Sequence, residues 1–145
     1  MLEVGCGGDY NSEIIAHSFP QVPYTGLDLS AAMIDVARKH YPTREFEVCS
    51  AYSLPRADRR VNIVLDGVAL LHMTGWRKVL PEHARVARSQ VIFQGLTLSA
   101  TEETLEFAKY AHGRPTIECV FNSSQLLEVC CRRSLKSRPV SLFEK

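Results

Sequence analysis

The segment Leu2-Glu3-Val4-Gly5-Cys6-Gly7-Gly8-Asp9 joins an apolar run to a glycine-rich turn at the start of the chain. The residues that follow it, 12–19, predict a short helix that ends before Pro20. A strand that ends in such a turn lets the backbone approach a ligand closely, because glycine has no Cβ to obstruct it. The segment therefore predicts a buried strand followed by a loop that suits a nucleotide-like cofactor.

Strand and helix patterns alternate through the next part of the chain. The nearly continuous apolar run 61–65 predicts a strand that is buried on both faces, as in a parallel sheet. Repeated alternation of strand and helix predicts an α/β fold, in which a doubly wound, mostly parallel sheet carries helices on both faces. The other predicted strands are 24–29, 45–49 and 90–98, and the predicted helices between them are 31–40 and 76–88.

The last third of the chain continues the alternation in a weaker form. Ser99 and Glu102 have the spacing of a capping box, which predicts a helix that carries Leu105 and Phe107. A second helix is predicted after residues 122–124, and a last short strand at 140–143. We expect one domain over residues 1–145.

Composition narrows the classes of partner. The chain has 145 residues and a net charge of +1, which gives no electrostatic reason to expect nucleic acid or an anionic membrane. It has no apolar run of about 20 residues and no signal-peptide pattern. The cysteines lack zinc-ligand spacing, so we expect no metal and reduced thiols in a cytoplasmic protein. They are Cys6, Cys49, Cys119, Cys130 and Cys131.

Ligands of a doubly wound sheet bind beyond the carboxyl ends of its strands, beside the first strand. Asp28 ends the second predicted strand, where its carboxylate could accept two hydrogen bonds from a ribose diol. A dinucleotide site would continue the pattern G-x-G-x-x-G to position 10, but Tyr10 stands there. The spacing therefore disfavours a nicotinamide-dependent oxidoreductase.

Four segments in order resemble the class I S-adenosylmethionine-dependent methyltransferases, particularly their UbiE-like (methyltransferase type 11) small-molecule branch. Residues 2–7 are similar to that family's first motif, E/D-x-G-x-G, and residues 25–38 to its second. Residues 46–55 and 61–73 are similar to the third and fourth. The resemblance covers residues 1–98 well and the remainder loosely. Four motifs at the right separations are a far more specific signal than any one of them.

The resemblance implies that S-adenosyl-L-methionine is the cofactor, and it assigns roles to individual positions. Gly5 and Gly7 would let the backbone face the methionine part, and Asp28 would hold the ribose. If the acceptor is an oxygen or carbon acid, a base must remove its proton, and His72 is the candidate. The residues assigned to the cofactor are Glu3, Gly5, Cys6, Gly7, Asp28, Leu29, Met33, Ser50, Ala51 and Asp66.

Two functions follow as expectations. The first is methyl transfer to a small-molecule acceptor. The alternative is a non-catalytic, methyltransferase-like binding or interaction module, because Asp9 and Ser50 depart from the family pattern. The family's cap of N-terminal helices would precede the first strand, where this sequence starts. We therefore expect a domain truncated at its N-terminus, whose open cofactor site a second copy or a partner chain could cover.

Overall fold

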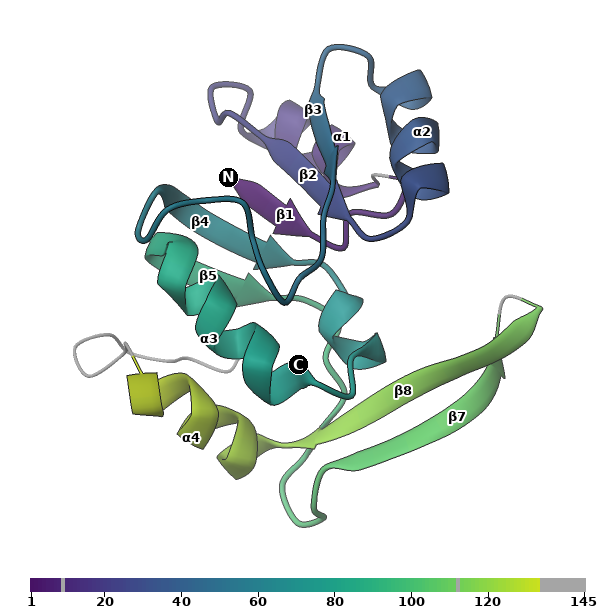
Figure 1. Cartoon of the computed structure of the whole chain (residues 1–145), viewed down its shortest axis with the longest axis vertical. Coiled ribbons are helices and arrows are strands. Elements are labelled where there is room, and N and C mark those ends of the chain that lie inside the picture. The colour runs from purple at the N-terminus through teal and green to yellow at the C-terminus, as the bar shows by residue number, and fades with distance from the viewer. Residues whose placement is uncertain (9, 112, 134–145) are drawn as a thin grey trace.

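The computed structural model describes residues 1–8, 10–111 and 113–133 (Figure 1). Five parallel strands form its main sheet, in the spatial order β3-β2-β1-β4-β5. The strand order reverses at β1, which pairs with β2 on one side and β4 on the other. The strands are β1 (Leu2–Val4), β2 (Thr25–Asp28), β3 (Glu45–Val48), β4 (Val61–Asp66) and β5 (Ala87–Phe93).

Helices cover both faces of the sheet, although the described segment between β3 and β4 has no helix. Neighbouring residues of β4 show the alternation, because Val64 belongs to one buried cluster and Leu65 to the other. The first cluster takes in α3 and α4, and the second takes in α1 and α2. The predicted doubly wound α/β sheet is therefore confirmed. The helices are α1 (Asn11–Ser18), α2 (Ala31–His40), α3 (Trp76–Val86) and α4 (Ser123–Arg133), and a 3₁₀ helix, η1 (Ala69–His72), follows β4.

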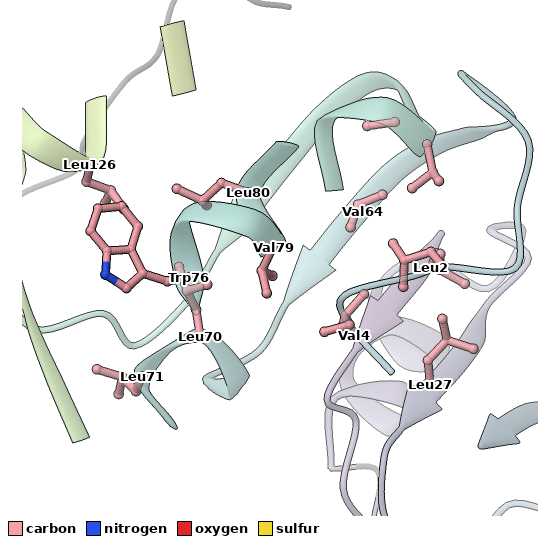
Figure 2. Packing of buried hydrophobic residues seen from close by; sticks show 14 of the residues in the cluster. Leu2, Val4, Leu27, Val64, Leu70, Leu71, Trp76, Val79, Leu80 and Leu126 are labelled. Carbon is pink, nitrogen blue, oxygen red and sulfur yellow. The ribbon is translucent and has the colours of Figure 1, made fainter. Parts of the chain in front are cut away.

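The larger cluster centres on the apolar face of α3 (Figure 2). Trp76 is fully buried, and its ring meets that of Phe121 edge to face at 5.4 Å between centroids. Leu126 of α4 packs beside them, so that the last described helix is held against α3. Burial of these side chains joins the C-terminal third of the chain to the sheet.

The region after β5 differs from the helix that the sequence predicts there. The side chain of Ser99 does accept the backbone N–H of Glu102, at 3.0 Å, as a capping residue would. The predicted helix through Leu105 and Phe107 is nevertheless wrong, because residues 105–111 form β7 of an antiparallel hairpin. This hairpin extends away from the sheet (Figure 1). Its strands are β7 (Leu105–Ala111) and β8 (Arg114–Asn122), and the short strand β6 (Leu98–Ser99) pairs in parallel with the end of β8.

Long-range packing explains why the capping signal does not produce a helix. Cys119 and Phe121 of β8 are fully buried against the body of the protein, and β7 pairs with β8 along its whole length. Leu105 and Phe107 stay exposed, so a helix here would have gained no stability from a buried apolar face.

Two predicted strands also need comment. The strand predicted at 90–98 runs from 87 to 93, and the one predicted at 140–143 lies outside the described residues. In the part of the chain that the structure describes, no helix has the length and apolar character needed to cross a membrane.

Candidate functional site

The glycine turn after β1 is fastened to β2 and leaves one open position. The backbone N–H groups of Gly5 and Cys6 both donate to the carbonyl of Leu27, at 2.7 and 2.9 Å. Gly5 and Gly7 have φ angles of +73° and +56°, which favour glycine. A Cβ at Gly5 would lie 2.2 Å from the Cβ of Ala69, whereas a Cβ at Gly7 would meet no atom within 4 Å. Gly5 is therefore needed for packing, and Gly7 borders free space.

Asp28 joins this turn to the start of α2. One carboxylate oxygen accepts the N–H of Gly7 at 2.8 Å, and the other accepts the N–H of Ser30 at 2.8 Å. The residue is half-buried. An ionised carboxylate can accept about four hydrogen bonds, so two hydroxyl groups of a ligand could still be bound. The geometry thus suits the predicted ribose contact.

Apolar side chains stand exposed beside Asp28. Leu29, which follows Asp28, is 76% exposed, and Met33, in the first turn of α2, is 46% exposed. Val48, at the end of β3, and Tyr52, in the turn after it, are also about half exposed. A planar heteroaromatic ring placed here would remove this apolar surface from water. The positions predicted to pack against adenine are therefore accessible.

The turn after β3 holds the third predicted pair. The hydroxyl of Ser50 accepts the N–H of Tyr52 at 3.3 Å, so it supports the turn itself. Ala51 is buried in the core. The backbone N–H of Cys49 donates to the carbonyl of Asp28 at 2.8 Å, which places this turn beside the end of β2.

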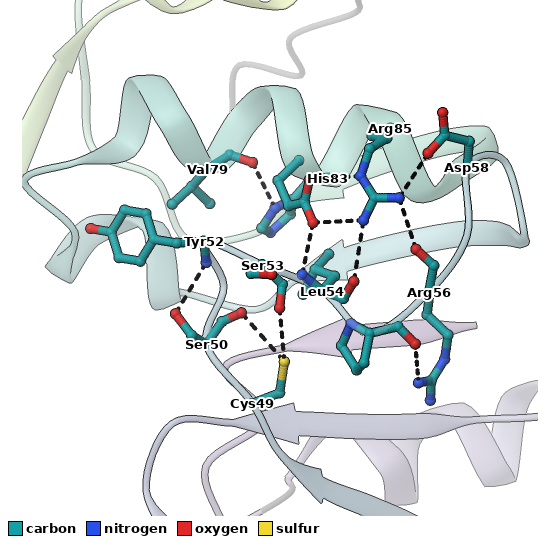
Figure 3. A network of polar contacts seen from close by, with 12 residues as sticks. Cys49, Ser50, Tyr52, Ser53, Leu54, Arg56, Asp58, Val79, His83 and Arg85 are labelled. Carbon is teal, nitrogen blue, oxygen red and sulfur yellow. Dashed lines mark hydrogen bonds and ion pairs between the residues drawn. The ribbon is translucent and has the colours of Figure 1, made fainter.

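A polar network fixes the segment between β3 and β4 to α3 (Figure 3). Glu82 accepts the backbone N–H of Leu54 at 2.7 Å and pairs with the guanidinium of Arg85 at 2.7 Å. Arg85 also donates to the carbonyls of Leu54 and Arg56 and pairs with Asp58. Hydrogen bonding to Arg85 lowers the pKa of Glu82 below its ordinary value of 4.5, and the same contacts raise the pKa of Arg85. These bonds hold residues 54–58, which follow the turn with Ser50 and Ala51, against α3.

Glu3 is buried beneath the turn. Its carboxylate accepts the side-chain amide of Asn11 at 2.7 Å and the hydroxyl of Tyr24 at 2.5 Å. A Cβ at Gly67 would lie 2.5 Å from one of its oxygens. Of the two roles that the resemblance implies for Glu3, a brace and a ligand of the amino group, this placement favours the brace.

Asp66 ends β4 and is fully buried. One carboxylate oxygen accepts the N–H groups of Leu70, at 3.0 Å, and Val68, at 3.4 Å, at the start of η1. The other lies 3.2 Å from Nε2 of His83, which is also fully buried. The sequence assigned Asp66 to the cofactor, but its carboxylate is turned inward. Any contribution to the site comes through the turn that it supports.

Sequence reasoning missed His83. The only signal was its spacing, because residues 76, 79, 80, 83 and 86 lie on one face of a helix. A histidine on that face is buried, and its partner Asp66 is 17 residues away.

His72 ends η1 and is exposed. Its Nδ1 lies 2.7 Å from the backbone carbonyl of Ile117 in β8, 45 residues along the chain. A carbonyl oxygen can only accept, so Nδ1 carries the proton, and Nε2 of the neutral ring keeps a lone pair. The contact with the hairpin thus makes Nε2 the ring nitrogen that could accept a proton.

These residues meet at one edge of the sheet because the carboxyl ends of parallel strands lie together (Figure 1). A family model described as a methyltransferase domain matches residues 2–93. The chain is 24% identical over 132 residues to a malonyl-[acyl-carrier protein] O-methyltransferase of Hamiltonella defensa, covering 90% of this chain and 50% of that one. It is 28% identical to a demethylmenaquinone methyltransferase of Thermotoga maritima, covering 61% of this chain and 38% of that one.

Solved structures share the fold. A SAM-dependent methyltransferase of Methanosarcina mazei superposes with a TM-score of 0.70 at 16% identity, covering 88% of this chain and 75% of that one. Coverage of the two curated relatives is lower, since the chain spans half the length of one and less of the other.

Proposed function

The chain belongs to the methyltransferase domain family, among the class I S-adenosylmethionine-dependent enzymes, and we propose that it transfers the methyl group of this cofactor to a small-molecule acceptor. One observation carries the proposal. Asp28 accepts the N–H of Gly7 at 2.8 Å beside a position that would stay clear even with a Cβ on Gly7. The turn and the carboxylate are thus joined in one cradle, open where a ligand would enter.

The residues present fit the cofactor. Asp28 would accept the ribose hydroxyls, because its two oxygens have bonding capacity left. Leu29 and Met33 would lie against the adenine, since both are exposed and apolar beside the carboxylate. The backbone at Gly7 would face the methionine part. Ser50 and Ala51 would border the adenine through their turn, which the Ser50 hydroxyl supports by accepting the N–H of Tyr52.

When bound, S-adenosylmethionine supplies a methyl group on a sulfonium, which is already strongly activated. The chain's own part is therefore chiefly to align the acceptor and to exclude water. If the acceptor is an oxygen or carbon acid, Nε2 of His72 is the proposed proton acceptor, because Ile117 holds the proton on Nδ1. One relative's name specifies O-methylation, a reaction that needs a base when the acceptor oxygen is a hydroxyl and none when it is an ionised carboxylate.

Two further properties belong to the proposal. A second copy or a partner chain would cover the exposed apolar surface around Leu29, with no nucleic acid or membrane involved. A cytoplasmic location is supported by Cys49 and Cys119, which are both free thiols, as expected in a reducing compartment.

Titration calorimetry with S-adenosylmethionine and S-adenosylhomocysteine tests the proposal. Binding of both, and none of NADH, is the expected result. Asp28→Ala should weaken the binding about 30-fold or more, whereas Asp35→Ala, which removes an exposed carboxylate from α2, should leave it unchanged. Binding without methyl transfer to any of a panel of small acids and phenols would favour the non-catalytic module. No binding of either compound at about 1 mM, a concentration that reveals even weak affinity, would overturn the cofactor assignment.

A further inference from the structure

A buried pair, Asp66 of β4 and His83 of α3, lies behind the candidate site and takes no part in the proposed reaction. Both side chains are fully buried, with Nε2 of His83 lying 3.2 Å from the carboxylate. Charged side chains are rarely buried to this degree unless they are paired. The family resemblance assigned no role to position 83.

The surroundings of the ring fix its orientation. Nδ1 lies 3.0 Å from the carbonyl of Val79, which can only accept, so Nδ1 carries a proton (Figure 3). Nε2 faces Asp66, and one proton must then lie between these two groups, whichever of them holds it. The ring also stacks on Phe93 of β5, at 6.1 Å between centroids and 23° between planes. The imidazole is therefore held from three elements.

The other oxygen of Asp66 fastens the turn that leads to His72. It accepts the N–H groups of Val68 and Leu70, the second at 3.0 Å. Val68 has a φ of +134°, which a β-branched residue rarely adopts. A turn with such a residue persists only where its surroundings hold it, and here Asp66 does so.

The same turn contacts both halves of the site. Ala69 lies against the glycine turn, so closely that a Cβ at Gly5 would clash with it. Three residues later, His72 donates from Nδ1 to Ile117 of the hairpin. A shift of η1 would therefore move His72 relative to both the cofactor cradle and the hairpin.

We propose that His83 is a positioning residue, which holds the carboxylate of Asp66 in the orientation that caps η1 and thereby sets the place and tautomer of His72. Its bearing on catalysis rests on the proposed function, whereas the link from His83 to η1 does not. The expected order of dependence is His83, Asp66, Leu70 and then His72.

The test compares His83→Gln, which keeps an amide donor for Asp66, with His83→Met, which keeps length but has no donor. Amide hydrogen exchange is measured at Leu70 and at Val64, a buried residue in the middle of β4 that reports global opening. In the methionine variant, exchange at Leu70 should accelerate at least about tenfold more than at Val64. In the glutamine variant, the two amides should change alike. The control His40→Met alters an exposed histidine at the end of α2.

Nitrogen-15 spectra of the His72 ring supply a second readout, which a purely structural role of His83 would not move. The wild-type protein and the glutamine variant should show the proton on Nδ1, and the methionine variant a mixture of tautomers. Equal acceleration at Leu70 and Val64 in a folded methionine variant, with His72 unchanged, would overturn the proposal. If the methionine variant does not fold, the glutamine variant decides. Its side-chain amide can still donate to Asp66, so a selective loss of exchange protection at Leu70 in that variant would also overturn the proposal.

The positioning role of His83 and the proposed methyl transfer are tested by different measurements, so either can be refuted without the other. Binding of S-adenosylhomocysteine to the wild-type protein tests the cofactor site, which centres on Asp28 and Gly7. Exchange at Leu70 is measured without any ligand. The affinity of the glutamine variant for S-adenosylhomocysteine should stay within about threefold of wild type, a difference well below 1 kcal/mol.

Discussion

Two aspartates end the strands on either side of β1, Asp28 as the last residue of β2 and Asp66 as the last residue of β4. Each accepts backbone N–H groups from the turn that follows its strand, Asp28 from Ser30 and Asp66 from Val68 and Leu70. Their surroundings differ. Asp28 is half-buried beside open space at Gly7, whereas Asp66 is fully buried against His83.

The difference shows that one local arrangement can serve two purposes. Both carboxylates accept N–H groups at the start of the helix that follows, because the first N–H groups of a helix have no partner within it. Solvent access then decides whether oxygens are left for a ligand. Asp28 can face the cofactor, and Asp66 can act only through η1 and His72.

The largest expected effect is the loss of stability when the buried aspartate, Asp66, is replaced. Asp66→Ala should lower the free energy of unfolding by about 3–5 kcal/mol, because it leaves His83 without its partner in the core. Urea unfolding followed by circular dichroism measures the loss. Asp35→Ala, at an exposed position of α2, is the control and should change stability by less than about 0.5 kcal/mol. A loss below about 1 kcal/mol for Asp66→Ala would show that the pair contributes little.

Replacing Asp28, the solvent-accessible aspartate, should affect ligand binding more than stability. Asp28→Ala should weaken the binding of S-adenosylhomocysteine by about 2–3 kcal/mol, or about 30- to 150-fold in Kd. Its unfolding free energy should fall by only about 1 kcal/mol, the usual cost of losing a cap. Calorimetry and urea unfolding on the same sample separate the two quantities. A stability loss as large as that of Asp66→Ala would remove the distinction between the aspartates.

Gly5 and Gly7 allow the same comparison of stability with ligand binding within one turn. Gly5→Ala should cost about 2 kcal/mol of stability, because the new Cβ would lie 2.2 Å from that of Ala69. Gly7→Ala should cost about 1 kcal/mol, from its positive φ alone. In contrast, Gly7→Ala should weaken cofactor binding more, because it fills the open position. Thermal unfolding should show the larger stability loss for Gly5→Ala, and calorimetry the larger affinity loss for Gly7→Ala. Equal losses of affinity in the two variants would contradict this prediction.

The smallest effect concerns a third carboxylate, Glu82, which holds the turn after β3. Its pKa is lowered mainly by the hydrogen bond to Arg85. A carboxyl with a lowered folded-state pKa stabilises the protein above its unfolded value, here 4.5, and loses that contribution as pH falls through the folded value. Glu82→Gln should therefore cost about 1 kcal/mol at pH 7 and less in acid. Urea midpoints for both proteins between pH 7 and pH 3 should converge, and parallel curves would refute the assignment.

Much of the first 93 residues followed from the sequence because local and global preferences agree there. The helix predicted at 31–40 forms over those residues, and Ser30 caps it with a hydroxyl that accepts the N–H of Met33 at 3.3 Å. Asp28 was found because it follows a short apolar strand at a fixed distance from the glycine turn. The helix predicted through Leu105 and Phe107 was wrong because Ser99 and Glu102 give a helix-start signal that no other local feature opposes. Pairing with β8 wins there, and that pairing depends on burial of Cys119 and Phe121.

The sequence by itself determined the parallel sheet, its glycine turn and the carboxylate of Asp28, because apolar periodicity, glycine and strand-end spacing are local properties. Only the tertiary structure decided which carboxylate stays open and which is buried. It also brought His72 to Ile117 and Asp66 to His83, across 45 and 17 residues. Burial and long-range pairing depend on how distant segments pack, and no pattern within one segment records them.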